Sequence, residues 1–397
     1  MAAVVETAPQ PQPATPAEWL QRNLFSSPLN TALTILSGLF VGFVAYQALH
    51  FVFVGAQWRI VRVNMKGYMI GGFPIEEAWR VWVCAYLVVL LSGLSIGMSR
   101  RNIRISPIRL ATAVLIGLGA LTILLYTTQT VLPRALTLGL PVATGAAIFA
   151  GRAWGSRLKR PLIGAWLLTF PAVLVVLLGF DGVPTRLWEG LFFNLIAATV
   201  GIVASFPLGI LLALGRRSDL PAVRMVCIVF IEIFRGVPLV AWLIFSKYVV
   251  DLTLPPQLEV PDIIKAFIVM TLFSAAYVGE IVRGGLQGIP NGQHEAARAL
   301  GLSTARLTTL VILPQALKAT IPAMISHFIS LFKDTSLFTA IEVTDLLAAA
   351  RRSANSLEFF GRDMESLLFA GLLFWAIAFT MSRWSQRLEV RLGVGER

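Results

Sequence analysis

The residues of this chain with the most chemical potential are charged side chains within or beside long apolar stretches. Glu232 and Arg235 stand in one such stretch, Glu280 and Arg283 in another, and 333–336, with the sequence Lys-Asp-Thr-Ser, closes a third. A charge at membrane depth is costly, so it usually pairs with another charge or meets a transported solute. We therefore expect ion pairing and solute binding from these groups.

Bond-breaking chemistry has no comparable support in the sequence. Cys84 and Cys227 lie in apolar runs, far from any Cys-X-X-Cys or Cys/His spacing, and they are interpreted as packing residues. His294 and His327 belong to no catalytic Ser/His/Asp order or metal-binding pattern. No Gly-Lys dipeptide occurs, so the phosphate-binding loop of an ATPase is absent. The sequence predicts no catalytic residue, no metal site and no ATP hydrolysis by this chain.

Composition indicates the solvent that surrounds these residues. The 397 residues are 56% hydrophobic and 14% charged, and the mean hydropathy is +0.76. Apolar runs of about 17–25 residues, the length that crosses a bilayer, recur along the chain. We predict an all-α integral membrane protein with about ten transmembrane helices, at 31–54, 81–98, 109–127, 135–151, 161–180, 189–214, 225–250, 263–285, 309–332 and 366–386.

Membrane topology explains the net charge of +12 better than nucleic-acid binding does. Basic residues gather between the apolar runs, at 100–109, 152–160 and 216–224, and these connections are expected in the cytoplasm. The connections at 181–189 and 251–262 are poor in basic residues. The exception is the external loop 55–80, which carries Arg59, Arg62, Lys66 and Arg80. Ten crossings leave both termini inside.

The chain divides into three parts. Residues 1–30 begin with a Pro-, Ala- and Gln-rich stretch and are expected to form a disordered cytoplasmic tail. Residues 31–182 form an N-terminal extension of about five helices, with an external turn expected at Gly67–Pro74. Residues 183–390 hold the charged and interrupted helices and carry the function. For the extension, the sequence supports only a packing role.

The connection 288–314 has a local structure that can be derived residue by residue. Pro290, Asn291 and Gly292 end one helix, and Glu295 is expected in the first turn of the next, where its charge suits the helix dipole. Gly301 stands where a left-handed C′ residue ends that short helix. Ser303 can cap the following helix. A compact helix–turn–helix suited to a soluble partner is predicted.

This connection resembles the EAA loop of binding-protein-dependent ABC importer permeases, because Glu295-Ala296-Ala297 is followed by Gly301 and by Leu313-Pro314. Stretches 232–238, 274–284 and 331–337 are similar to the polar amino-acid branch of that family. The segment 57–82 resembles permeases of general L-amino-acid systems. The resemblance implies a five-helix, MetI-like permease core in the bacterial inner membrane.

The resemblance also implies partners and residue roles. The partners are an ABC ATPase dimer that binds ATP and Mg²⁺, a homologous second permease subunit, an external solute-binding protein, an amino-acid substrate and membrane lipid, with no nucleic acid and no cofactor in this chain. Glu295, Ala296, Ala297, Gly301 and Pro314 are assigned to ATPase coupling. From their positions along the expected helices, the substrate pathway is assigned to Lys333, Asp334, Thr335 and Ser336, with an internal Lys333–Asp334 arrangement as the alternative. A gate or intersubunit contact is assigned to Glu232, Arg235, Glu280 and Arg283, and for Glu232 and Arg235 anchoring to one another or to neighbouring backbone is the favoured local role.

Two alternatives to an ABC importer permease stay open at this point. Broken helices and an intramembrane Asp334 or Glu280 would equally suit an ion-coupled secondary transporter of amino acids. A non-transporting scaffold or sensor is the third reading. The EAA-type loop is the feature that favours coupling to an ATPase.

Overall fold

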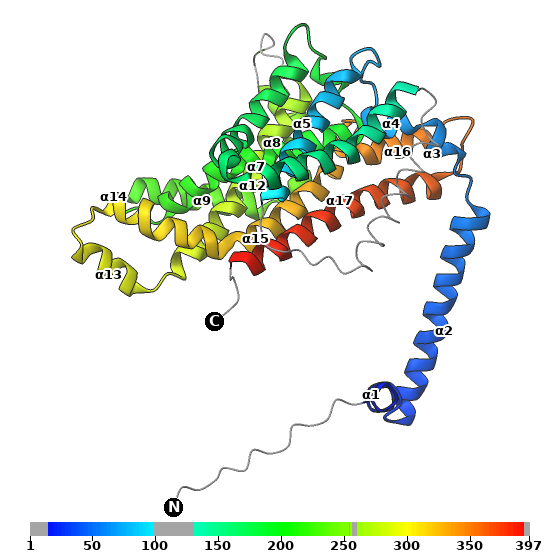
Figure 1. Ribbon diagram of the computed structural model, residues 1–397, viewed down its shortest axis with the longest axis horizontal. Helices are drawn as coiled ribbons and strands as arrows, with labels where there is room; N and C mark the ends of the chain where they lie inside the picture. Colours follow the sequence, from blue (N-terminus) through cyan, green and yellow to red (C-terminus); the bar gives the residue numbers. More distant parts are fainter. Residues whose placement is uncertain (1–14, 99–130, 254, 256–259, 393–397) are drawn as a thin grey trace, which may run out of the picture. The chain divides into compact units, whose positions relative to one another are not determined.

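The computed structural model describes residues 15–98, 131–253, 255 and 260–392, and all regular elements within them are helices (Figure 1). The predicted span 109–127 and the basic connection 100–109 lie outside the described residues. The chain divides into two compact units, one ending at Trp58 and the other beginning at Arg59. Each unit is described by itself below.

The first unit is helical where a disordered tail was predicted. Helix α1 covers Pro16–Asn23, α2 covers Pro28–His50, and the π-helical turn η1 covers Phe51–Gly55. The prediction of disorder over 1–30 is therefore wrong from residue 16 onward. Its physical reason is a capping box: Thr15 accepts from the Glu18 amide, and the Glu18 carboxylate accepts from the Thr15 amide.

The second unit is built around five membrane-length segments in its C-terminal part. Its elements are α8 (Gly190–Arg216), α9 (Pro221–Gly236), α10 (Leu239–Ile244), η3 (Phe245–Val249), α11 (Val250–Thr253), α12 (Asp262–Gln287), α13 (Asn291–Ala299), α14 (Thr304–Arg306), η4 (Leu307–Ile312), α15 (Leu313–Asp334), η5 (Thr335–Ile341), α16 (Leu346–Ala354) and α17 (Asp363–Leu392).

The segments alternate in direction. Helices α8 and α12 run parallel, because Phe193 stacks on Phe267 near their starts and Ser205 contacts Ser274 further along. Helix α15 runs the opposite way, and α17 runs antiparallel to α15. One end of the core therefore carries α13 and the end of α8, and the other carries α16 and the start of α8. We call these the α13 end and the α16 end.

One predicted span is broken. The apolar run 225–250 forms α9 and α10, which meet at a bend of 102°. Gly236 ends α9, and Pro238 precedes α10; proline has no amide hydrogen to continue the ladder of hydrogen bonds. Counting by length and apolar composition, the described residues contain seven candidate spans, or eight with this bent pair. Of the ten predicted spans, 109–127 is not described, and 135–151 is helical but is not among these candidates.

Within the extension, α7 (Val131–Leu178) packs as a helical hairpin against α5 (Ala78–Met98). The helical assignment of α7 is continuous, yet its contacts with α5 require the chain to reverse direction. Tyr86 donates to the Leu136 carbonyl and Gly97 lies against Ile148, whereas Trp166 donates to Ser95. The first leg therefore runs parallel to α5 and the second leg antiparallel. They correspond to the predicted runs 135–151 and 161–180.

The close approach of the first leg depends on glycine. A Cβ atom at Gly97 would overlap the carbonyl oxygen of Ile148. At the other end of α5, buried Arg80 donates to the carbonyls of Val176, Gly179 and Phe180, which lack helical partners. This end adjoins the start of α8, so the basic segment 152–160 of α7 lies at the end opposite the α16 end.

The loop 55–80 contains structure that the sequence did not predict. Helices α3 (Arg59–Val63) and α4 (Met65–Ile70) precede the turn, and Tyr68 of α4 is fully buried. The predicted turn at 67–74 is therefore correct only after residue 70, where Gly71 has φ +50°. A short 3-10 turn, η2 (Thr185–Leu187), links the extension to α8.

Candidate functional site

The α13 segment has the local geometry that the sequence predicted at Gly301. This residue has φ +73°, its amide donates to the Arg298 carbonyl at 2.9 Å, and the Leu302 amide donates to the Ala297 carbonyl at 3.2 Å. The two bonds form a Schellman motif, which satisfies the final carbonyls of α13. The turn fixes the angle between α13 and the helix that follows.

Alanine at Gly301 is expected to weaken this turn through backbone conformation alone. No heavy atom lies within 4 Å of a Cβ placed there, so the left-handed φ is the only penalty, about 1–2 kcal/mol. Asparagine tolerates that conformation and should retain more transport activity than alanine does. Measured transport rates of G301A and G301N test this order. Equal loss in both variants would contradict a conformational origin.

The two faces of α13 differ in their exposure to solvent. Glu295 and Ala296 are exposed, whereas Ala297 is buried against the apolar residues Leu286, Leu307 and Ile312. Glu295 has no hydrogen bond or ion pair among the described residues. The helix begins at Asn291, which places Glu295 in the second turn, so its predicted place in the first turn is wrong. Its charge is available to a partner.

The connection from α13 into α15 departs from regular helix. Ser303 occupies the N-cap position of α14, but its side chain makes no capping hydrogen bond, contrary to the prediction. The π-helical η4 then precedes Pro314, whose missing amide hydrogen cannot bond the carbonyl four residues earlier. α14, η4 and α15 still form one continuous candidate span that begins directly beside the short helix.

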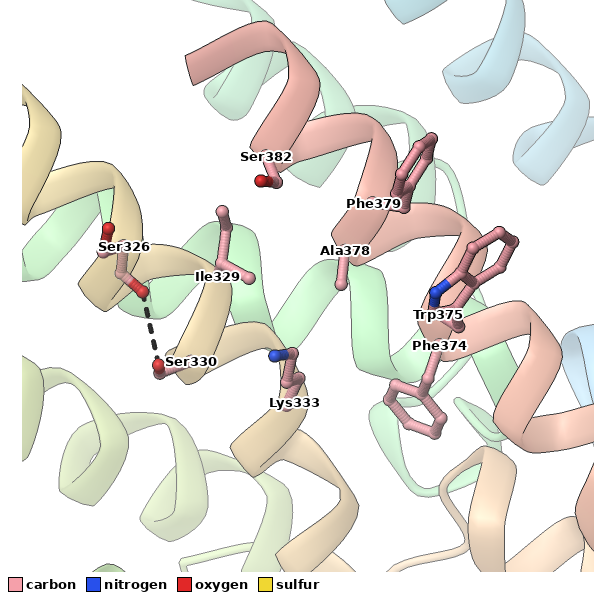
Figure 2. Close-up of a pocket in the computed structure, with 9 residues that line it drawn as sticks. All are labelled: Ser326, Ile329, Ser330, Lys333, Phe374, Trp375, Ala378, Phe379 and Ser382. Carbon is pink, nitrogen blue, oxygen red and sulfur yellow. Dashed lines mark hydrogen bonds between the residues drawn. The ribbon is translucent and has the colours of Figure 1, made fainter. Parts of the chain in front are cut away.

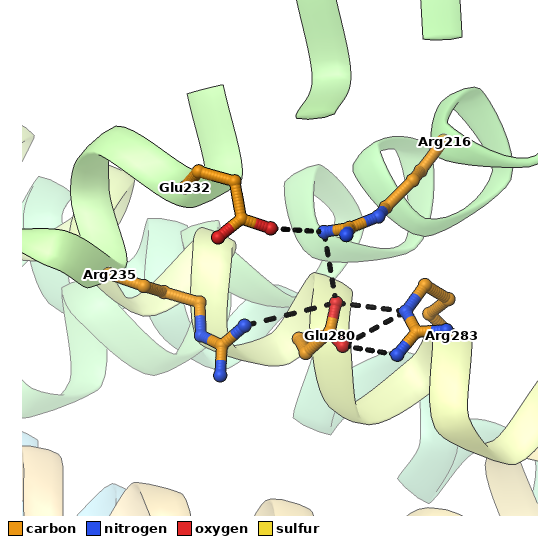
Figure 3. Close-up of polar contacts among 5 residues, drawn as sticks. All are labelled: Arg216, Glu232, Arg235, Glu280 and Arg283. Atoms are coloured by element: carbon orange, nitrogen blue, oxygen red, sulfur yellow. Dashed lines mark hydrogen bonds and ion pairs between the residues drawn. The ribbon is translucent and has the colours of Figure 1, made fainter. Parts of the chain in front are cut away.

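Near the α13 end, five charged residues of α8, α9 and α12 meet in one cluster (Figure 3). Glu280 accepts from Arg283 at 2.9 Å and from Arg216 at 3.2 Å. Arg216 also donates to Glu232 at 3.0 Å, and Arg235 lies 4.0 Å from Glu280. We call these five residues the charge cluster. The cluster contains the four residues that were predicted as a gate or intersubunit contact, together with Arg216.

Within the charge cluster, Glu232 and Arg235 pair with residues of other helices and not with one another. Glu232 pairs with Arg216, and Arg235 turns to Glu280 and to the ring of Tyr277, 5.5 Å from its guanidinium. Arg216 was assigned to a cytoplasmic connection because it ends an apolar run. A basic residue in the last turn of a long helix was the available signal.

A chain of polar side chains continues from the charge cluster into the core. The Tyr277 ring stacks on His327 of α15 at 5.4 Å, His327 Nε2 is 2.9 Å from the Ser274 hydroxyl, and that hydroxyl donates to Ser205 at 2.9 Å. Helices α8, α12 and α15 are thereby joined at mid-length. The contact with Ser274 satisfies His327 inside the helix bundle.

The residues predicted for a substrate pathway occupy different environments. Lys333 is exposed and lines an open groove of about 520 Å³ between α15 and α17, with aromatic side chains of α17 on the facing wall (Figure 2). Asp334 and Ser336 are half-buried, and Thr335 is fully buried. Neither Lys333 nor Asp334 has a hydrogen bond or ion pair among the described residues.

The buried Thr335 belongs to a network that the sequence analysis missed. Its hydroxyl donates to the Phe332 carbonyl at 2.6 Å and accepts from Asn194 of α8 at 2.8 Å. The Asn194 oxygen accepts from the Leu346 amide, and its nitrogen lies 3.4 Å from Asp345. Both Asn194 and Asp345 are fully buried. The network ties α8, η5 and the start of α16 together.

Asp345 lies outside the candidate spans and caps α16 through the amides of Leu347 and Ala348. Burial raises the pKa of its carboxyl from 3.8 to about 6, although these amides and Asn194 oppose the rise. The folded protein therefore keeps a proton that the unfolded chain releases. This contribution to the free energy of unfolding is complete below about pH 4 and lost as the pH rises to about 6.

Asparagine at Asp345 is expected to remove that pH dependence, worth about 3 kcal/mol across the window. Thermal unfolding of the detergent-solubilised protein between pH 4 and 7 measures it. The difference in the free energy of unfolding between the wild type and D345N should change with pH in this window. The exposed Asp363→Asn serves as the control, and a D345N curve parallel to wild type would refute the assignment.

Metal binding has no support in the part of the chain that the structure describes. No group of three or more His, Cys, Asp or Glu side chains there could hold a metal ion.

Comparisons with known proteins cover nearly the whole chain. Residues 205–394 match the family described as "Binding-protein-dependent transport system inner membrane component". The chain is 34% identical to the "Inner membrane amino-acid ABC transporter permease protein YhdY" of Escherichia coli, covering 95% of this chain and 93% of that protein. It is 33% identical to the "Glutamate/glutamine/aspartate/asparagine transport system permease protein BztC" of Rhodobacter capsulatus, with 97% and 96% covered.

A shorter relative is also similar. The "Probable glutamine ABC transporter permease protein GlnP" of Bacillus subtilis is 34% identical, over 52% of this chain and 93% of that protein. The family match lies in the C-terminal half, whereas the two long relatives extend along the N-terminal half as well. The extension is therefore a shared feature of the long relatives.

Proposed function

Because this chain belongs to the amino-acid ABC transporter permeases, multi-pass proteins of the bacterial inner membrane, we propose that it forms the membrane path of an amino-acid importer driven by a separate ATPase. The proposed substrate class is a zwitterionic amino acid. ATP and Mg²⁺ would bind to the partner ATPase dimer. The other expected partners are an external solute-binding protein and a second, homologous permease subunit.

The observation that carries this proposal is the geometry of the α13 segment. A short helix presents an exposed carboxylate at Glu295 that pairs with none of the described residues, while its opposite face is packed on the core through Ala297. The Schellman turn at Gly301 and the connection through Pro314 make the helix move with α15. A rigid helix of this kind can pass the motion of a soluble partner into the membrane segments.

In our proposal, the motion of α13 acts on the charge cluster. It links α8, α9 and α12 toward the α13 end of the core, and its five residues carry three positive and two negative charges. In our proposal, displacement of α13 by ATP-driven closure of the ATPase dimer changes these contacts and so biases the equilibrium between inward- and outward-open states. Lys333, Asp334 and Ser336 are proposed to contact the amino acid on its way through.

An ion-coupled secondary transporter is the competing function. The exposed Glu295 carboxylate has no role in that mechanism, whereas coupling to an ATPase gives it one. Radiolabelled amino-acid uptake into proteoliposomes that hold the assembled complex separates the two functions. Uptake that requires ATP and the binding protein supports the proposal. Uptake driven by an ion gradient without ATP would overturn it.

A further inference from the structure

Helices α3 and α4 are built into the permease core at the α16 end. Helix α4 packs on α8 and α16, and Tyr68 is fully buried with Leu346, Ala350 and Ala370. Just after α4, the Gly72 amide donates to the Glu189 carboxylate at 2.7 Å. These contacts cross from the extension into the C-terminal half, so this part of the extension is more than a peripheral packing layer.

The Tyr68 hydroxyl takes part in a relay of hydrogen bonds between three helices. It lies 2.7 Å from Ser366 Oγ of α17, and the Ser366 hydroxyl donates to the Ala350 carbonyl of α16 at 2.7 Å. Since Ser366 uses its hydrogen for that carbonyl, the Tyr68 hydroxyl is the donor to Ser366. The direction of both bonds is thus determined, and every polar atom in the relay has a partner.

The same α16 helix is held at its start by the network of Asp345, Asn194 and Thr335. Thr335 directly follows Lys333 and Asp334, two of the residues proposed to meet the substrate. The helix has only 9 residues, so its two anchors are little more than one turn apart. A shift of α16 at the Tyr68 side would be transmitted to Thr335 and the end of α15.

We propose that Tyr68 is a positioning residue by which the N-terminal extension holds α16 and η5 at the mouth of the translocation path. The inference rests on the proposed function, and it assigns to the extension a role in solute entry. Its site is remote from the charge cluster and from α13. The delivery of substrate should therefore depend on Tyr68, while ATP hydrolysis in the absence of substrate should not.

The test is Tyr68→Phe, which removes only the hydroxyl, in the assembled complex reconstituted into proteoliposomes. Initial uptake rates are measured against the concentration of substrate-loaded binding protein, together with basal ATP hydrolysis. We expect the apparent KM to rise roughly threefold to tenfold, the range for loss of one buried hydrogen bond, with basal hydrolysis unchanged. Tyr86→Phe is the matched control, because its hydroxyl bonds the Leu136 carbonyl within the α5–α7 pair.

Ser366→Ala should reproduce the change in KM, and the double variant Y68F/S366A should add little to either single change. Identical KM values for Y68F and Y86F would overturn the inference, as would an equal fall in basal ATP hydrolysis. A Y68F complex that fails to assemble, beside an S366A complex with normal KM, would overturn it too. Absence of ATP-driven uptake in the wild type would instead refute the proposed function.

Discussion

Lysine at Glu295 is expected to reduce ATP-driven amino-acid uptake strongly while the complex still assembles. The side chain is exposed on α13 and has no hydrogen bond or ion pair among the described residues, so folding should not depend on its charge. Reversal of that charge removes the contact proposed to meet the ATPase. We expect uptake to fall by roughly tenfold or more, which corresponds to at least about 1.4 kcal/mol of coupling free energy. Uptake and ATP hydrolysis are measured in the same proteoliposomes.

The matched control is Glu76→Lys, the same charge reversal at another exposed glutamate, in the loop before α5. Its uptake should equal that of the wild type. Loss of ATPase subunits from the E295K complex would mean that the Glu295 contact is needed for assembly. Full assembly, with ATP hydrolysis that drives no uptake, would mean that the contact is needed for coupling. Normal uptake by E295K would refute a role for this carboxylate.

Glutamine at Glu280 is expected to destabilise the permease strongly. Glu280 is the acceptor shared by Arg216 and Arg283, with Arg235 at 4.0 Å, and its side chain is only 21% exposed. Removal of its charge leaves three arginines with one carboxylate. We expect a loss of roughly 2–4 kcal/mol, somewhat below the value for a fully buried pair. Thermal unfolding in detergent measures it.

Glu358→Gln provides the comparison for this change. Glu358 pairs with Arg59 at 2.7 Å, but both side chains are more than half exposed, so the pair should contribute less than about 1 kcal/mol. The expected order is therefore a large shift in unfolding temperature for E280Q and a small one for E358Q. Similar shifts would mean that the charge cluster is solvated and contributes little to the core.

The sequence was most informative where structure is decided by neighbouring residues. The left-handed conformation of Gly301 follows from a glycine placed just after an alanine-rich helix, and the structure has it. The break before Pro238 is equally local, since proline and glycine stand within three residues of each other. The approximate bounds of most membrane segments followed from apolar length alone.

Contacts between distant residues could not be predicted in this way. Tyr68 and Ser366 are separated by 298 positions, and no local pattern near either one indicates the other. Arg216 was assigned to a connection, because only the packing of α8 against α12 brings it to Glu280. Buried Asn194 was overlooked as one amide in an apolar run. Each missed residue is polar and satisfied by a partner from another helix.

The bend between α9 and α10 has a consequence for how the protein is made. α9 has 16 residues, about 24 Å of helix, which is shorter than the roughly 30 Å hydrocarbon core of a bilayer. After the bend of 102°, the chain continues through α10, η3 and α11, which have 6, 5 and 4 residues. A segment with this shape cannot leave the insertion machinery as an independent straight helix. Helix α12 packs against α9, α10 and η3 on both sides of the break, while the break itself, at 236–238, is exposed. The segment is therefore held in place by its neighbour and does not cross the bilayer as one straight helix.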